Sequence, residues 1–302
     1  FTRADARAFG WSDSALSRAV RSGRVTKVRH GHFSTTGGAD PILRAHAALA
    51  ACRGSVISHR SAALVHDLPL LDPAPARPDL TVPPGRTGDV TSALLHRAGL
   101  PPEDVVVIGD AAVTSVARTV VDLARTLPLD SALVPMDAAL HRRFVDRAAL
   151  EAVLTRCAIW PNARRAARVI ALADGRSESP LETVSRLVIP RLGLPIPQPQ
   201  GVVRNRFGLV IGRCDFYWDE PGVFGEADGR SKYDGRDILT AEKDRQEALE
   251  RLGLVSVRWG WSTVRVRPRG LATRVLDAFE RGRLRDRSGF PRKWSVDPPV
   301  TG

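Results

Sequence analysis

Apolar and polar positions in the first 34 residues follow the periods of two short helices and a hairpin. Gly10 interrupts the first helical stretch, and Ser12 can cap a second helix by accepting one of its orphan backbone N–H groups. Apolar residues of that helix recur at helical spacing at Ala15, Leu16, Ala19 and Val20. Gly23 is expected to end the helix. A hairpin is expected next, with apolar positions at Val25, Val28 and Phe33 and a turn at His30-Gly31-His32. This is the order of a winged helix-turn-helix, whose second helix enters the major groove of DNA.

Helical periods return over residues 41–51 and 58–68, where Ser58 can cap the second helix. We expect both helices to pack against the winged unit, giving a DNA-binding region over residues 1–71. The proline-rich run at 72–79 predicts a linker. Beyond it, short strand-like runs and helices predict a middle α+β region over residues 80–175. Its strands are expected at 80–83, 92–97 and 105–109, and its helices at 113–125, 130–141, 146–157 and 162–174. In the first of these helices, capped by Thr114 or Ser115, Arg118 and Asp122 form an i,i+4 pair.

The last part of the chain predicts a mixed sheet flanked by helices over residues 176–285. Ser179 can cap a helix over 179–192, in which Pro180 suits the first position and Glu182 falls in the first turn. Two strands joined by a turn at 219–222 follow, and a helix then leads into a further strand at 254–261. The fold class that we expect is therefore α/β with several domains, and 302 residues suffice for two or three cores.

The chain is strongly basic, with a formal net charge of +12 and a pI near 10.9. Such a balance favours a polyanionic partner, because neutralising phosphates releases counterions. Only four of the 45 basic residues are lysines, so an arginine-rich composition from a GC-rich genome is the alternative explanation. The distribution of charge favours double-stranded DNA as the partner, because many basic residues fall within the predicted winged unit. The DNA-binding candidates are Arg18, Arg21, Arg24, Lys27 and Arg29.

Other classes of protein and site are disfavoured. No apolar run approaches the roughly 20 residues that span a bilayer, and charges run through the first 30 residues. The expected location is the cytoplasm, without a membrane partner. Cys52, Cys157 and Cys214 lie far apart without a CxxC pair, so we expect reduced thiols and neither a disulfide framework nor a zinc knuckle. His46, His59 and His66 match no common metal-ligand spacing, and the pair His30 and His32 has no third ligand nearby in the sequence.

Acidic side chains interrupt two strands that are otherwise built for burial. Asp215 lies four residues before the turn and Glu226 four after it, so the two can lie opposite each other in the hairpin. Glu226 and Asp228 share one face of the second strand, because side chains alternate with a period of two. A buried group of carboxylates repels itself unless a cation relieves the repulsion. We therefore predict that Asp215, Glu226 and Asp228 bind Mg²⁺ or Mn²⁺.

Two further groups complete the predicted catalytic set. Glu182 would supply an acid from the preceding helix, although a carboxylate in a first turn can equally complement the helix dipole. Lys232 follows the sharp turn that Gly229 permits and could stabilise charge on a phosphate. Arg245 and Arg258 are additional candidates for phosphate contacts, each with a structural or solvated role as the alternative. A bound cation would activate water for phosphodiester hydrolysis.

The runs DFYW, GEADGRSKY and RQEALERLGLVSVRW resemble the PD-(D/E)xK nuclease superfamily and, within it, the DUF559 or very-short-patch-repair-like endonucleases. The resemblance covers residues 178–268 and implies a restriction-endonuclease-like sheet. It also implies that Asp215 and Glu226 bind the metal and that Glu182 is the helix acid. One position departs from the pattern, because Asp228 stands where the superfamily usually has lysine and Lys232 lies four residues further on.

The run FTRADARAFGWSDSALSRAVRSGRVTKVRHGHF resembles the winged helix domain of AbiEi-family type IV antitoxins, and VTSVARTVVDLA resembles the segment that follows that domain. The resemblance covers residues 1–125. It implies DNA binding, autorepression of an operon and a cognate toxin partner. Two hypotheses result: a DNA-binding, Mg²⁺-dependent endonuclease, or an AbiEi-like antitoxin and transcriptional regulator whose nuclease-like domain is degenerate and non-catalytic.

Overall fold

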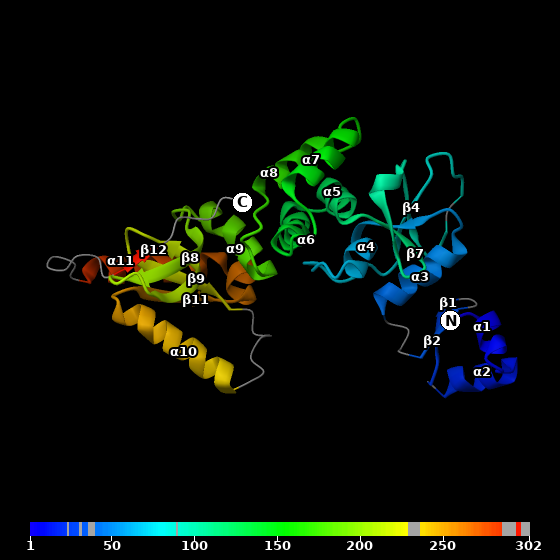
Figure 1. Ribbon diagram of the computed structural model, residues 1–302, viewed down its shortest axis with the longest axis horizontal. Coiled ribbons are helices and arrows are strands. Elements are labelled where there is room, and N and C mark those ends of the chain that lie inside the picture. Colours follow the sequence, from blue (N-terminus) through cyan, green and yellow to red (C-terminus); the bar gives the residue numbers. More distant parts are fainter. Residues whose placement is uncertain are drawn as a thin grey trace. The chain divides into compact units, whose positions relative to one another are not determined.

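The computed structural model describes residues 1–22, 24–29, 32–35, 40–88, 90–228, 236–285 and 294–296. The chain forms two compact units, Phe1–Ala173 and Asp174–Gly302, which are described separately (Figure 1). Helices and two mixed five-stranded sheets confirm the expected α/β class. In the described part of the chain, no helix is long and apolar enough to cross a bilayer.

The N-terminal end of the first unit has the predicted winged order. Its elements are α1 (Arg3–Ala8), α2 (Asp13–Arg21), β1 (Thr26–Arg29) and β2 (His32–Ser34), with the two strands paired antiparallel. Thr2 and Asp5 form a reciprocal capping box on α1. The predicted Ser12 cap of α2 is confirmed, because its Oγ accepts from the N–H of Ala15 at 3.1 Å. Gly23, His30 and Gly31, expected to end α2 and to form the turn, lie outside the described residues.

A small apolar core holds these four elements together. Ala6, Leu16, Ala19, Val25 and Phe33 form one buried cluster, each at most 5% exposed. Leu16 and Ala19 line the inner face of α2, as the helical period predicts. Arg18 and Arg21 of the same helix are exposed.

The remainder of the first unit is a five-stranded sheet with helices, in the strand order β5-β4-β3-β7-β6. The pairs β3/β7 and β4/β5 are parallel, and β3/β4 and β6/β7 are antiparallel. The strands are β3 (Val56–Ile57), β4 (Asp79–Val82), β5 (Leu94–Arg97), β6 (Val105–Ile108) and β7 (Ala111–Thr114). The helices are α3 (Pro41–Ala51), α4 (His59–Val65), α5 (Val116–Thr126), α6 (Leu129–His141), α7 (Arg147–Arg156) and α8 (Ala163–Leu172), besides a 3-10 turn at Pro102–Asp104.

Helix α3 contacts β1 of the winged unit, as expected, but α3 and α4 also pack against the five-stranded sheet, which the expectation did not include. Ala45 and Ala48 of α3 and Ala62 of α4 are buried in the core of the five-stranded sheet, together with Ile57 and Leu80. Their small side chains let the helices approach the sheet closely, which the apolar period alone does not specify. The predicted domain ranges 1–71, 80–175 and 176–285 remain predictions.

A buried network of charges anchors α5, as the i,i+4 spacing of Arg118 and Asp122 suggested. The Arg118 guanidinium lies 2.7 Å from Asp122 through Nε and 2.8 Å from Asp104 through Nη1. It also stacks 4.6 Å from the centre of the Trp160 ring. Ser115 caps the helix by accepting from the Arg118 N–H. These contacts satisfy charges that are only 1–2% exposed and that would otherwise be costly to bury.

His59, the first residue of α4, stacks on His96 of β5. The rings of His59 and His96 stack with centroids 3.6 Å apart, and His96 Nε2 lies 2.9 Å from Oδ1 of the buried Asp79. Ser58 occupies the predicted N-cap position of α4 but makes no side-chain capping bond, because its Oγ contacts His59 Nδ1 at 3.0 Å instead of a helix N–H. His59 itself has a φ of 49°, a left-handed backbone that is rare for a histidine.

Burial and the adjacent His96 hold the pKa of His59 well below its ordinary value, while Asp79 opposes and Arg118 and Arg125 reinforce the effect. As pH falls below about 6.5, the unfolded chain therefore takes up this proton before the folded one, and stability falls. Below about pH 6.5, the free energy of unfolding of the wild type should fall more steeply than that of His59→Asn, by up to about 1.4 kcal/mol per pH unit. Denaturant unfolding at several pH values measures both slopes. Asparagine tolerates the left-handed backbone. Parallel curves for the two proteins would contradict the assignment.

The second unit is a five-stranded sheet in the order β11-β10-β9-β8-β12, with helices packed against it (Figure 1). β10 and β11 are parallel, and the other pairs are antiparallel. The strands are β8 (Gln198–Asn205), β9 (Val210–Trp218), β10 (Val223–Ala227), β11 (Val255–Trp259) and β12 (Trp294–Val296). The helices are α9 (Pro180–Arg191), α10 (Arg236–Arg251) and α11 (Pro268–Leu284), besides a π-helical turn at Ser262–Val266.

A close contact beside Glu226 fixes α9 against the sheet. Trp259 of β11 donates from Nε1 to Ser185 Oγ of α9 at 2.8 Å. The Trp259 ring lies over Gly225, where an added Cβ would meet it at 2.4 Å. Gly225 is therefore required for this packing, which brings the first turn of α9 to the strands that carry the predicted acids.

Candidate functional site

Glu182 is held at the start of α9 by a full set of donors. Its Oε1 accepts from Ser179 Oγ at 2.7 Å, and its Oε2 accepts from the Glu178 N–H at 3.0 Å and from Gln200 Nε2 at 2.8 Å. In return, Ser179 Oγ accepts from the Glu182 N–H at 3.2 Å, so Ser179 caps the helix as predicted. The carboxylate is 6% exposed. Glu182 is thus a rigid, buried charge.

Asp215 and Glu226 face each other across the β9–β10 hairpin. The ladder pairs Phe216 with Gly225, which puts Glu226 across from Asp215 as the sequence predicted. Asp215 Oδ2 accepts from the N–H of Ala227 at 2.8 Å, a contact that turns its carboxylate toward β10. The turn at 219–222 and the alternation of the two strands produce this juxtaposition.

The three acids form one electrostatic cluster. Burial, and then the neighbouring negative charges of Glu226 and Glu182, raise the pKa of Asp215 to about 8. The Ala227 N–H and Arg245 act in the opposite direction without cancelling the effect. A carboxyl group so perturbed by burial and like charges is typical of functional sites, because folding gains nothing from this repulsion.

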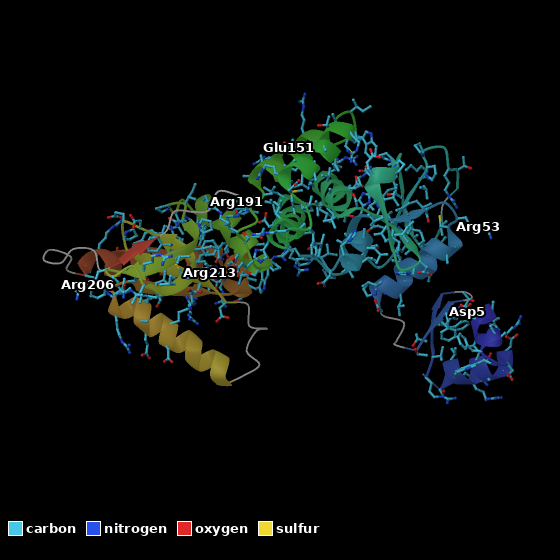
Figure 2. All side chains as sticks on the ribbon, viewed as in Figure 1. Asp5, Arg53, Glu151, Arg191, Arg206 and Arg213 are labelled. Carbon is cyan, nitrogen blue, oxygen red and sulfur yellow. The ribbon has the colours of Figure 1, made fainter. Side chains whose placement is uncertain are left out.

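Arginine side chains border the cluster. Arg245 of α10 lies 3.1 Å from Glu226 through Nη2 and donates through Nη1 to the carbonyl of Arg213. Arg213, labelled in Figure 2, extends from β9 and pairs with Glu178 at 2.6 Å. Arg258 of β11 is in register with Glu226 in the parallel pair. Arg245 therefore contacts the site directly, whereas Arg258 is a strand neighbour of one of its acids.

The other predicted site residues are less closely tied to this cluster. Asp228 follows the end of β10, where its N–H donates to the carbonyl of Trp259 at 2.8 Å. Lys232 lies outside the described residues. Among the residues that the structure describes, no three His, Cys, Asp or Glu side chains are grouped so that they could hold a metal ion. The metal-ligand and catalytic assignments therefore remain predictions.

Gln200 is a member of the cluster that sequence reasoning missed. β8 pairs Pro199 with Phe216 and Gly201 with Cys214, so Gln200 lies across from Asp215. Its backbone has a φ of 54°, in the left-handed region. A polar residue next to a glycine inside a strand was the available signal, but the register that places it against Asp215 depends on long-range pairing.

The predicted DNA-binding side chains lie on the surface of the winged unit. Arg18, Arg21, Arg24 and Lys27 are exposed, and the side chain of Arg29 is not among those described. By contrast, Arg3 and Arg7 pair with Asp13 at 3.2 and 2.6 Å. In the described part of the chain, no ion pair engages Arg18, Arg21 or Lys27, which leaves their charges available to a polyanion.

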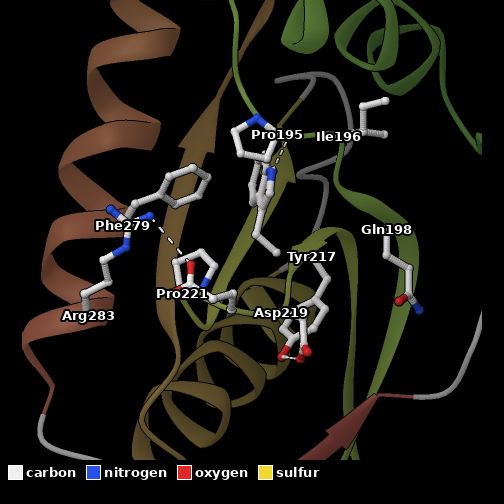
Figure 3. A pocket seen from close by; sticks show the side chains of 10 residues that line it. Pro195, Ile196, Gln198, Tyr217, Asp219, Pro221, Phe279 and Arg283 are labelled. Carbon is white, nitrogen blue, oxygen red and sulfur yellow. Dashed lines mark hydrogen bonds and ion pairs between the residues drawn. The ribbon is translucent and has the colours of Figure 1, made fainter.

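A hollow at the other end of the β9–β10 hairpin is separate from the acid cluster (Figure 3). It is lined by ten residues: Pro195, Ile196, Gln198, Tyr217, Trp218, Asp219, Glu220, Pro221, Phe279 and Arg283. Its polar groups already pair with protein atoms. Trp218 Nε1 donates to the Pro195 carbonyl at 2.8 Å, and Arg283 lies 3.6 Å from Glu220. Because these polar groups are engaged within the protein, we do not assign a ligand to the hollow.

Residues 1–33 match the family model described as "Transcriptional regulator, AbiEi antitoxin". The match supports the AbiEi-like character of residues 1–33, and the resemblance of residues 34–125 remains a prediction. The resemblance of residues 178–268 to DUF559 endonucleases remains a prediction.

Two uncharacterized proteins of Mycobacterium tuberculosis, MT2308 of strain CDC 1551 / Oshkosh and Rv2248 of strain ATCC 25618 / H37Rv, are similar to this chain. Each is 30% identical over 171 residues, which make up 57% of this chain and 63% of the relative. The match thus spans less than two thirds of these relatives. The crystal structure of the Rv2827c protein from Mycobacterium tuberculosis is 17% identical, with a TM-score of 0.37, and the alignment covers 57% of this chain and 68% of that one.

Proposed function

We propose that the second unit is a divalent-metal-dependent DNA endonuclease and that the winged unit binds double-stranded DNA. The observation that carries the proposal is the group formed by the buried Glu182 and Glu226 and the partly buried Asp215, in which burial and then like charges raise the pKa of Asp215 to about 8. The repulsion among these acids is unfavourable in the protein alone. A cation bound among them would offset it by attracting each carboxylate.

The donor set fits a hard divalent cation. Asp215 and Glu226 offer carboxylate oxygens, and the buried Oε1 of Gln200 has no hydrogen-bond partner among the described residues. Oxygen donors of these kinds suit Mg²⁺ or Mn²⁺. Glu182 is less available, because three donors already occupy its oxygens. Asp215 and Glu226 are thus the side chains that would hold the ion.

Each side chain of the cluster has a distinct part in the proposed reaction. A bound Mg²⁺ supplies Lewis acidity toward a phosphate and lowers the pKa of its water. Asp215 is oriented for binding by the Ala227 N–H, and Glu226 by Arg245. Arg245 also brings a positive charge to the place where a phosphate would approach. Glu182, through Gln200, fixes α9 against β8 and keeps negative charge beside Asp215.

The direct test incubates the full chain with supercoiled plasmid in Mg²⁺, in Mn²⁺ and in excess EDTA. Nicked DNA is expected with either ion and not with EDTA. Nicking that persists in EDTA, or no nicking under any of the three conditions, would contradict the proposal.

DNA binding by the winged unit gives a second expected result. Replacing Arg18, Arg21 and Arg24 by alanine should weaken duplex binding and reduce the slope of log affinity against log salt by up to about 2.7, at ~0.9 per lost phosphate contact. Fluorescence anisotropy at several salt concentrations measures both. The matched control changes the three exposed α8 arginines, Arg164, Arg165 and Arg168, and removes the same charge. Equal losses in the two variants would show a general charge effect instead of a binding surface.

A second candidate function is transcriptional regulation, with AbiEi-like DNA binding and a cognate toxin as partner. The match of residues 1–33 to the AbiEi antitoxin family favours it. In that case the second unit is a scaffold, and the Arg245–Glu226 ion pair at 3.1 Å serves in place of a metal. Protein that represses its own promoter but binds no Mg²⁺ would support this alternative.

A further inference from the structure

The side chain of Gln200 connects the two parts of the acid cluster. From β8 it lies across from Asp215, while its Nε2 donates to Glu182 on α9 at 2.8 Å. The orientation of the amide follows from this bond. A buried carboxylate only accepts hydrogen bonds, so the nitrogen must face Glu182 and the oxygen must point elsewhere.

The oxygen of that amide is an acceptor without a donor. Gln200 Oε1 is buried and has no hydrogen-bond partner within the described residues. Leaving such an atom unsatisfied is costly, and unsatisfied buried polar atoms in native proteins are few. The atom therefore indicates a group that the described residues do not supply.

The backbone of Gln200 is also strained. Its φ of 54° lies in the left-handed region, which costs free energy for a residue with a Cβ. Glycine would adopt this conformation without strain. Strain of this kind persists at positions where function needs the side chain.

We propose that Gln200 is a neutral oxygen ligand of the divalent cation held by Asp215 and Glu226, and that its Nε2 positions Glu182 at the same time. This inference rests on the proposed function. Amide oxygens of asparagine and glutamine are ordinary ligands of hard cations. A neutral donor adds an oxygen to the site without adding to the repulsion among its acids.

The test is Mn²⁺ binding to the full chain, followed by electron paramagnetic resonance of free Mn²⁺ and independent of any cleavage. Gln200→Gly relieves the left-handed backbone, which offsets the lost bond to Glu182, so the variant should fold while binding Mn²⁺ about 10-fold more weakly or worse. Gln200→Met, which keeps the length of the side chain, should lose affinity similarly. Gln198→Met, two residues away on the same strand, should bind as wild type does.

The outcomes separate this inference from the function on which it rests. Wild-type binding that Asp215→Asn abolishes but Gln200→Gly leaves unchanged would overturn the role of Gln200 alone. A wild-type chain without Asp215-dependent Mn²⁺ binding would overturn both. If Gln200→Met fails to fold, the Mn²⁺ affinity of Gln200→Gly alone tests the role of Gln200.

Discussion

Replacing Glu226 by glutamine is expected to reduce Mg²⁺-dependent nicking of plasmid DNA by at least ~100-fold. The substitution keeps the shape of the side chain and its contact with Arg245, but it removes one of the two carboxylate charges available to the ion. Metal activation of water and phosphate contributes several kcal/mol, and each ~1.4 kcal/mol is tenfold in rate. Initial rates of conversion of supercoiled to open-circular plasmid measure the change.

The control for this loss is Glu220→Gln, in the exposed turn of the same hairpin. The Glu220 side chain is 77% exposed and lies 3.6 Å from Arg283, at the turn and away from the acid cluster. It should nick at the wild-type rate. Glu226→Gln protein that is folded and nicks within twofold of wild type would contradict a catalytic role for the cluster.

Replacing Arg118 by methionine is expected to destabilise the first unit by about 3 kcal/mol or more. The variant leaves Asp104 and Asp122, each 1% exposed, without their shared cation, although Arg156 and Arg125 remain beside them. Breaking a buried pair costs about 3–5 kcal/mol, because one charge stays buried without compensation. For a unit of this size the melting temperature of the first transition should fall by roughly 10 °C in calorimetry.

An exposed ion pair of the same unit provides the comparison. Arg142 lies 3.1 Å from Asp67, a side chain that is 95% exposed. Arg142→Met should therefore change stability by less than about 1 kcal/mol. Similar losses in the two variants would mean that burial of the Arg118 network is not what makes it stabilising.

The hairpin of the site could be predicted because its determinants are local. The turn at 219–222 fixes which residues of β9 and β10 oppose each other, so counting from it places Asp215 across from Glu226. The caps Ser12 and Ser179 could be predicted for the same reason, since each stands directly before a periodic apolar stretch, whereas Ser115 was one of two candidates beside Thr114.

Pairing between strands that are distant in the sequence could not be predicted in the same way. Gln200 meets Asp215 only through the β8–β9 register, which contains an irregularity near Val203, and its left-handed backbone has no signal in the sequence. The stacking of His59 on His96 joins residues of two different elements, which no local pattern indicates. Helices α3 and α4 show periodic apolar faces, but periodicity does not state which core a face joins.

The most direct test of the metal site is an anomalous difference map from a crystal of the full chain grown or soaked with Mn²⁺. An ion held by Asp215 and Glu226 should give a peak within about 2–2.5 Å of carboxylate oxygens of both residues, the distance range of oxygen-bound divalent ions. A well-ordered acid cluster without a peak, with Arg245 still paired to Glu226, would contradict the metal site and would leave the second unit as a non-catalytic scaffold.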